Sequence, residues 1–241
     1  MGISMEDFLW IYAPPVALML LVGAGAHTLL LARPAYRGWW GEYKVNFALR
    51  LCLSGEYRVF SNALYRGQTD DETTQIDHIV VSRYGLFVIE TKCFRGRIVT
   101  DPNAPDTWLQ RVGRRKYKVR NPLLQNYAHV KALHRVTGIH SQQIQSFVVM
   151  AGQAKFVYGM PEGVFSIWSV VRKIQGFRAP VFTAGHVSSI TKALERCRVK
   201  GGYWAAKRHV ELLKRKETRR KNAASSKLQE ECPKQSQQWP Q

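Results

Sequence analysis

Apolar runs separated by short polar turns fill the middle of the chain, and the clearest case lies at residues 75–92. Two such runs, Ile76–Val81 and Leu86–Ile89, flank a short polar segment that ends in Gly85. Short runs rich in Val, Ile and Phe around a glycine are typical of a β-hairpin. Neither run alternates with polar residues, so we expect central strands that are covered on both faces.

The segments on either side of this hairpin complete an α/β pattern. Apolar residues at helical spacing predict a helix from Gly41 to about Cys52, and Asn121 and Pro122 are typical of the start of another, which runs to about Val136. The remaining predictions are strands at 57–64, 94–100 and 144–150, a second hairpin within 108–119, a strand leading into a short turn or helix at 164–171, and a helix at 187–197.

Phe8 to Leu31 carries no charged residue. About 20 apolar residues suffice to cross a bilayer, so we expect one N-terminal transmembrane helix. A cleaved signal peptide is the alternative, because Ala24 to Ala26 are small, but acidic and not basic residues precede the apolar stretch. Cations follow the stretch, so the positive-inside rule predicts a single-pass protein of the inner (plasma) membrane with its bulk in the cytoplasm.

We therefore expect four parts along the chain. They are a transmembrane anchor at 1–33, a linker at 34–40, a globular α/β domain at 41–200, and a basic helix with a disordered tail at 201–241. The basic helix suits either DNA or anionic phospholipid, and the sequence does not separate the two.

A large positive charge points to polyanionic partners. Lys and Arg number 36 against 17 Asp and Glu, which gives a formal charge of +19 and favours nucleic acid or an anionic membrane face. The second hairpin is a candidate phosphate-contacting loop, although a solvated hairpin is the alternative. Its six cations are Arg111, Arg114, Arg115, Lys116, Lys118 and Arg120. The four cysteines form no C-x-x-C pair, which argues against a zinc site and suits a reducing compartment.

Three charged residues lie at the ends of the central hairpin. Asp77 begins the first apolar run, while Glu90 and Lys92 end the second. Strand alternation places Glu90 and Lys92 on one face, and Asp77 is able to reach the same end. Two carboxylates beside an ammonium group can hold a hard divalent cation and activate water next to a phosphate. The alternative is a buried Asp–Lys ion pair without catalysis.

The order Asp77, Glu90-x-Lys92, then residues 108–110 (WLQ) and 121–126 (NPLLQN), resembles the nuclease-related domain (NERD) family of the PD-(D/E)XK nuclease superfamily. The resemblance covers about residues 41–150. It implies a restriction-endonuclease-like core, with a mixed central sheet flanked by helices. It also implies nucleic-acid cleavage that depends on Mg²⁺, with Mn²⁺ as the alternative ion.

The same resemblance suggests further site residues. A helix that begins Gly-Glu precedes the sheet in this family, which makes Glu42 a candidate third metal carboxylate; a first-turn Glu favoured by the helix dipole is the alternative. Gln110 and Gln125 lie on elements that border the active site in related nucleases. Gln110 would orient water or a phosphate, or merely close a backbone hydrogen bond, and Gln125 would contact the nucleic acid.

The leading expectation is therefore a membrane-anchored, Mg²⁺-dependent nuclease on the cytosolic face, with DNA as the expected substrate. Two alternatives stay open: a catalytically inactive nucleic-acid-binding module, and a membrane-tethered adaptor whose basic tail binds phospholipid. Many enzymes of the implied fold pair to cut both strands, so a homodimer is also compatible with the sequence.

Overall fold

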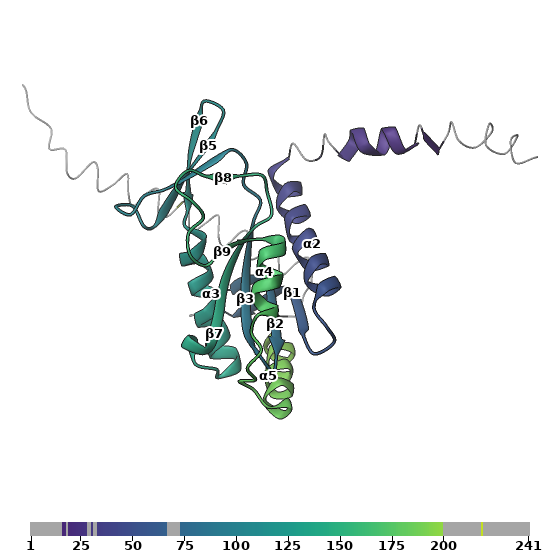
Figure 1. The fold of residues 1–241 in the computed structure, drawn as a ribbon, viewed down its shortest axis with the longest axis vertical. Coiled ribbons are helices and arrows are strands. Elements are labelled where there is room, and N and C mark those ends of the chain that lie inside the picture. The colour runs from purple at the N-terminus through teal and green to yellow at the C-terminus, as the bar shows by residue number, and fades with distance from the viewer. Residues whose placement is uncertain are drawn as a thin grey trace, which may run out of the picture.

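The computed structural model describes residues 16–17, 19–27, 30, 33–66, 73–199 and 218. A five-stranded sheet in the order β1-β2-β3-β7-β9 lies at the centre (Figure 1). Neighbouring strands from β1 to β3 are antiparallel, whereas β7 and β9 continue the sheet in parallel with β3. The strands are β1 Arg58–Arg66, β2 Thr73–Ser82, β3 Gly85–Lys92, β7 Ile144–Met150 and β9 Val164–Ser166.

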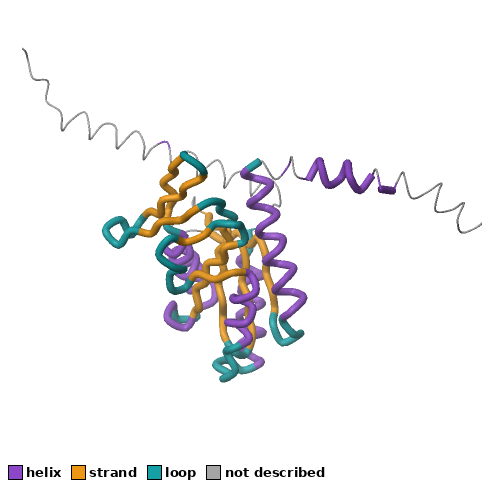
Figure 2. Tube along the Cα trace, turned by 45° about the horizontal axis from the view of Figure 1, so that its top comes forward, coloured by secondary structure: helices purple, strands orange, loops and turns teal. Residues whose placement is uncertain are grey.

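Four helices cover the two faces of this sheet (Figure 2). They are α2 Pro34–Cys52, α3 Pro122–Thr137, α4 Ile167–Gln175 and α5 Ala184–Cys197. The α2 and α4 helices pack on one face and α3 and α5 on the other, while a 3-10 turn at Ser141–Gln143 leads into β7. The chain therefore forms three layers, with the sheet in the middle.

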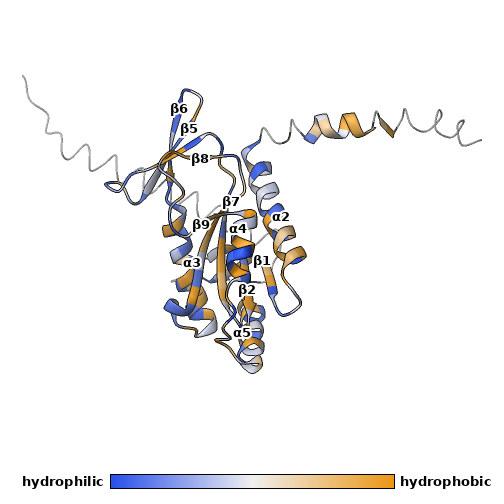
Figure 3. Cartoon of the chain, in the orientation of Figure 1, coloured by the Kyte–Doolittle hydropathy of each residue, from blue (hydrophilic) through white to orange (hydrophobic). Residues whose placement is uncertain are grey.

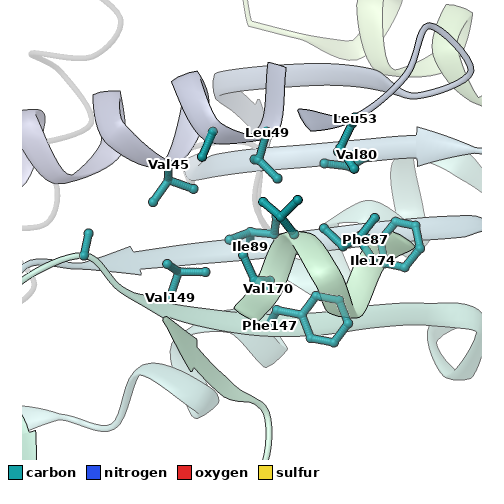
Figure 4. Close-up of a cluster of buried hydrophobic side chains, with 13 residues drawn as sticks. Val45, Leu49, Leu53, Val80, Phe87, Ile89, Phe147, Val149, Val170 and Ile174 are labelled. Atoms are coloured by element: carbon teal, nitrogen blue, oxygen red, sulfur yellow. The ribbon is translucent and has the colours of Figure 1, made fainter. Parts of the chain in front are cut away.

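The predicted central hairpin is confirmed as β2 and β3, with Ser82 paired to Gly85 at the turn. Alternate β3 side chains point to opposite cores. Phe87 and Ile89 pack with α2 and α4 (Figure 4), whereas Leu86 and Val88 pack with α3 and α5. Both faces of the hairpin are buried, as its continuous apolar runs predict.

The local sequence explains the ends of α3. The side chain of Asn121 accepts a hydrogen bond from the Leu123 amide at 2.9 Å, and Pro122 occupies the first turn. Gly138 closes the helix in the left-handed region, at φ 73°, where a glycine costs little. The predicted start and end of this helix are confirmed to within one residue.

A second sheet corrects the predicted fold class, which has one central sheet. Its order is β6-β5-β4-β8, and it projects from the body (Figure 1). The chain leaves the central sheet near Gly96, where φ is +75° and an added Cβ would lie 2.0 Å from the Arg111 carbonyl oxygen. Only glycine permits this approach. The strands are β4 Arg97–Thr100, β5 Thr107–Val112, β6 Arg115–Arg120 and β8 Lys155–Phe156.

The predicted transmembrane helix is also wrong. None of the helices in the described part of the chain is both long enough and apolar enough to cross a membrane. Figure 3 colours much of the short helix before α2 as hydrophobic. The α2 helix is longer, but it carries Arg37, Glu42, Lys44 and Arg50.

Two other predictions concern the ends of the domain. The α2 helix begins at Pro34 and so includes the predicted linker at 34–40. The predicted basic helix and tail at 201–241 lie outside the described residues, apart from Thr218. The end of the globular domain at residue 200 and the inner-membrane location stay predictions, whereas the transmembrane anchor at 1–33 does not.

Candidate active site

Glu90 and Lys92 share one face at the end of β3, as strand alternation predicts. The Lys92 ammonium group donates to Glu90 Oε1 at 2.6 Å and to Gln125 Oε1 at 3.0 Å. Glu90 is almost fully buried, while Lys92 keeps partial access to solvent. Gln125 lies in the second turn of α3, so helix and strand together hold the ammonium group in place.

His129, one helical turn after Gln125, contacts the other oxygen of Glu90. Its Nε2 lies 2.9 Å from Glu90 Oε2, and its Nδ1 lies 2.9 Å from the Thr74 hydroxyl oxygen on β2. The imidazole is buried. A chain of hydrogen bonds therefore runs from β2 through α3 to β3, and it fixes the orientation of the Glu90 carboxylate.

Asp77 completes the hairpin part of the site from β2. Its Oδ2 accepts a hydrogen bond from the Thr91 amide at 2.8 Å, and its side chain is buried. It does not pair with Lys92, whose ammonium group donates to Glu90 and Gln125. The Asp–Lys ion pair that the sequence left open is therefore not formed.

Glu42 reaches the same cluster from the first half of α2. Gly41, beside it, is buried, and an added Cβ would lie 3.1 Å from the Cys93 Cβ and 3.3 Å from the Ala151 Cβ. The helix therefore approaches the ends of β3 and β7 closely, and this close packing explains the glycine at position 41. Glu42 interacts electrostatically with Glu90 and Lys92.

The three carboxyl groups differ in their affinity for protons. Burial, followed by repulsion from Glu90 and Glu42, raises the pKa of Asp77 well above its ordinary value. Burial and then Glu90 also raise the pKa of Glu42. Burial opposes ionisation of Glu90 as well, but hydrogen bonds and charge from His129 and Lys92 outweigh it and lower the pKa of Glu90. The site thus holds more carboxylate than its own cations neutralise.

His78 follows Asp77 in the sequence and adjoins the charged cluster, because it interacts with the Glu42 backbone and with the charge of Glu90. Burial lowers the pKa of His78 to about 4, so its imidazole is neutral at pH 7. Its Nδ1 lies 3.5 Å from the Thr91 hydroxyl oxygen, at the limit of a hydrogen bond.

We tested whether these residues suit a divalent cation. Carboxylate oxygens are the ligands that Mg²⁺ prefers, and a cation would relieve the repulsion that raises the pKa values of Asp77 and Glu42. Within the described residues, however, no three His, Cys, Asp or Glu side chains are arranged as a ready-made metal site. Both Glu90 oxygens already accept hydrogen bonds. The carboxylate oxygens of the site therefore fit Mg²⁺. Glu90, one of the three candidate ligands, is already in contact with Lys92 and His129.

The other predicted site residues lie in the second sheet. Gln110, on β5, donates to the Arg95 carbonyl oxygen at 2.9 Å, which is the structural role left open by the sequence, and its catalytic role stays a prediction. The six cations of the predicted phosphate-contacting loop lie on β5, β6 and their turn, and Figure 3 shows this hairpin as mainly hydrophilic.

Sequence analysis missed two residues of α3 that organise the site. Asn126 is fully buried and donates to the Val88 and Phe147 carbonyl oxygens and to the Ser146 hydroxyl, which ties α3 to β3 and β7. His129 orients Glu90. Polar residues on the buried face of a predicted helix, at positions 125, 126 and 129, are the signal that would have found both.

We predict different outcomes for two glycine substitutions in α2. Both Gly38→Ala and Gly41→Ala gain helix propensity, which is worth about 1 kcal/mol. Gly38 has no atom within 4 Å of an added Cβ, so its variant should be more stable. Gly41→Ala should lose about 1–3 kcal/mol from overpacking against Cys93 and Ala151.

Urea denaturation measures the free energy of unfolding of both variants. Equal stability gains in both variants would show that α2 does not need its close approach to the strand ends.

Taken together, the fold and the site define a class of protein. A mixed sheet with an Asp on one strand and Glu-x-Lys at the end of the next is the arrangement of PD-(D/E)XK nuclease-like proteins. Residues 37–151 match the model of the nuclease-related domain (NERD) family. The resemblance predicted from the sequence is thereby confirmed.

One protein of similar sequence is known by a name that states no function. An uncharacterized protein of Bacillus anthracis is 39% identical over 100 residues, which cover 42% of this chain and 46% of that protein. The match thus spans less than half of the relative's length. No solved structure matches the chain.

Proposed function

We propose that this protein hydrolyses phosphodiester bonds of DNA with the help of Mg²⁺. The nuclease-related domain supports a nuclease-like function. The observation that carries the finer proposal is the cluster of Asp77, Glu90 and Glu42 around Lys92, in which burial and mutual repulsion raise two of the three carboxyl pKa values. A protein without catalytic use for these charges gains nothing from burying them together, because burial of charge costs free energy.

Each residue has a distinct task in this proposal. Asp77, Glu90 and Glu42 would hold the cation, which when bound supplies an acidified water and neutralises charge on the scissile phosphate. Lys92, held by Gln125, donates hydrogen bonds to a phosphate oxygen or to the attacking water and stabilises the charge that develops in the transition state. His129, held by Thr74, keeps the Glu90 carboxylate in one orientation.

A direct test is incubation of the full chain with supercoiled plasmid, with Mg²⁺, with Mn²⁺ or with EDTA. We expect nicked or linear product with either ion and none with EDTA, and we expect Glu90→Gln to give none under any condition. Cleavage that persists in EDTA, or in Glu90→Gln, would contradict the assignment.

One observation favours a second candidate, an inactive nucleic-acid-binding module. Both Glu90 oxygens accept hydrogen bonds from protein side chains, and no ready-made metal site is found among the described residues. In that case the same assay yields no product, although plasmid still binds. Heating the protein with and without Mg²⁺ separates the candidates further, because a bound ion raises the melting temperature.

A further inference from the structure

A cavity of about 550 Å³ opens beside the end of β1, and none of its lining residues belongs to the carboxylate cluster. It is lined by the last residue of β1, the last turn of α3, and the end of α5 with the residues that follow. Its volume is in the usual range for ligand sites, about 300–1,000 Å³. The described lining residues include four arginines and no acidic side chain: Arg66, Arg135, Arg196 and Arg198.

Some of these arginines have ordinary structural roles. Arg135 and Arg196 lie in the last turns of α3 and α5, where a cation suits the helix dipole. Arg198 donates to the Ser61 and Asn62 carbonyl oxygens, and Arg66 also has an interaction partner. None of these roles requires side chains from three separate elements to line one cavity. Converging like charges repel each other, so the arrangement favours an anion, and guanidinium groups match the geometry of phosphate.

The arginine pocket (the cavity lined by these four arginines) is linked to the candidate active site. Arg135 lies six residues after His129 on α3, which is about 9 Å along the helix axis. Arg66 lies opposite Thr73 in the β1–β2 strand register. The next residue, Thr74, contacts His129. One strand of duplex DNA carries a phosphate about every 3.4 Å of helix axis. Phosphates two or three positions along a strand are therefore about 7–10 Å apart, which is similar to the rise along α3 between His129 and Arg135.

We propose that the arginine pocket binds backbone phosphates beside the scissile bond and holds the substrate at a point separate from the catalytic cluster. The inference rests on the proposed function only in taking nucleic acid as the ligand. Contacts of this kind are independent of sequence, so they add affinity without base specificity.

Fluorescence anisotropy of the full chain with a labelled duplex of about 20 base pairs, across a KCl series, tests the pocket. All proteins carry Asp77→Asn, which is expected to slow cleavage of the duplex by about 10²-fold or more. The test pair is Arg135→Gln with Arg196→Gln, and the control pair is Arg172→Gln with Lys192→Gln. The control residues are exposed, lie on α4 and α5, do not line the pocket, and remove the same charge.

We expect the test pair to bind about tenfold or more weakly, with a salt slope flatter by about 0.9 per lost contact, and the control pair to bind almost as the parent does. Equal DNA affinity and equal salt slope in the two pairs would refute DNA binding by the pocket, whether or not the wild type cleaves plasmid. A third outcome is that inorganic phosphate stabilises the parent protein but not the test pair, while the two bind DNA equally well. That result would also overturn the proposal and would show that the pocket binds a free anion.

The outcomes also separate this inference from the proposed function. A wild type that never cleaves, combined with weaker DNA binding in the test pair alone, refutes the nuclease proposal and leaves the pocket in place.

Discussion

Asp77→Asn is expected to reduce cleavage by about 10²-fold or more, and yet to raise the melting temperature of the metal-free protein at neutral pH. Asp77 is buried beside two other carboxylates that repel its negative charge. Asparagine has nearly the same shape, and its carbonyl oxygen can still accept the hydrogen bond from the Thr91 amide. The substitution therefore removes the cost of a buried charge without removing the contact.

The pH dependence of this stabilisation has a defined sign. The pKa of Asp77 in the folded protein is raised above its ordinary value of 3.8, so between these two values the folded state binds the proton more tightly than the unfolded state. Stability of the wild type therefore falls as pH rises through that window. The advantage of Asp77→Asn should grow over the same window and vanish below about pH 3.8.

Thermal denaturation from pH 3 to pH 8, with and without Mg²⁺, measures both parts. Mg²⁺ should stabilise the wild type and not Asp77→Asn, while Asp106→Asn, in an exposed loop, serves as control. A melting temperature that drops in Asp77→Asn at pH 7 without metal would refute the electrostatic description of the site.

Lys92→Ala is expected to lower the single-turnover cleavage rate by about 10²–10³-fold, the range observed when one transition-state stabiliser is lost. Its ammonium group lies 2.6 Å from Glu90 and 3.0 Å from Gln125, at the centre of the cluster. DNA affinity should change little, because one phosphate contact among several is removed. Lys92→Gln is the companion variant, since it keeps a hydrogen-bond donor but not the charge.

The matched comparison is Arg114→Ala with Arg115→Ala and Lys116→Ala, at the tip of the β5–β6 hairpin. This variant should bind DNA more weakly at all sequences, with a salt slope flatter by about 0.9 per lost contact, and should cleave at a nearly normal rate once DNA is saturating. If both variants lose affinity and rate in the same proportion, Lys92 acts as a phosphate contact and not in catalysis.

Local patterns predict much of the central domain. The β2–β3 hairpin follows from two continuous apolar runs, and the ends of α3 follow from Asn121 and Gly138. Glu90 and Lys92 share a face because side chains on a strand alternate, and the structure agrees with a contact of 2.6 Å. Each of these features depends on residues close together in the chain.

The features that local patterns missed depend on contacts between distant segments. The separation of the second sheet requires Gly96 to approach Arg111, and no sequence periodicity reports that contact. In the sequence, nothing distinguishes His129 from any other histidine of an amphipathic helix. Its contact with Glu90 exists only because α3 packs on β3. In sequence, the apolar stretch near the N-terminus is long and hydrophobic enough to cross a bilayer. Among the described residues of the structure, however, no helix is long and apolar enough to do so.

The outer edge of β1 has a bearing on how the protein behaves at high concentration. An exposed edge strand can recruit another strand and start aggregation. Here Asn62 interrupts the edge with a left-handed conformation, at φ 50°, and the Arg198 guanidinium group and the Val199 amide occupy backbone oxygens along β1. A chain shortened for crystallisation should therefore retain Arg198 and Val199, because their removal would free backbone oxygens along the outer edge of β1 to pair with another chain.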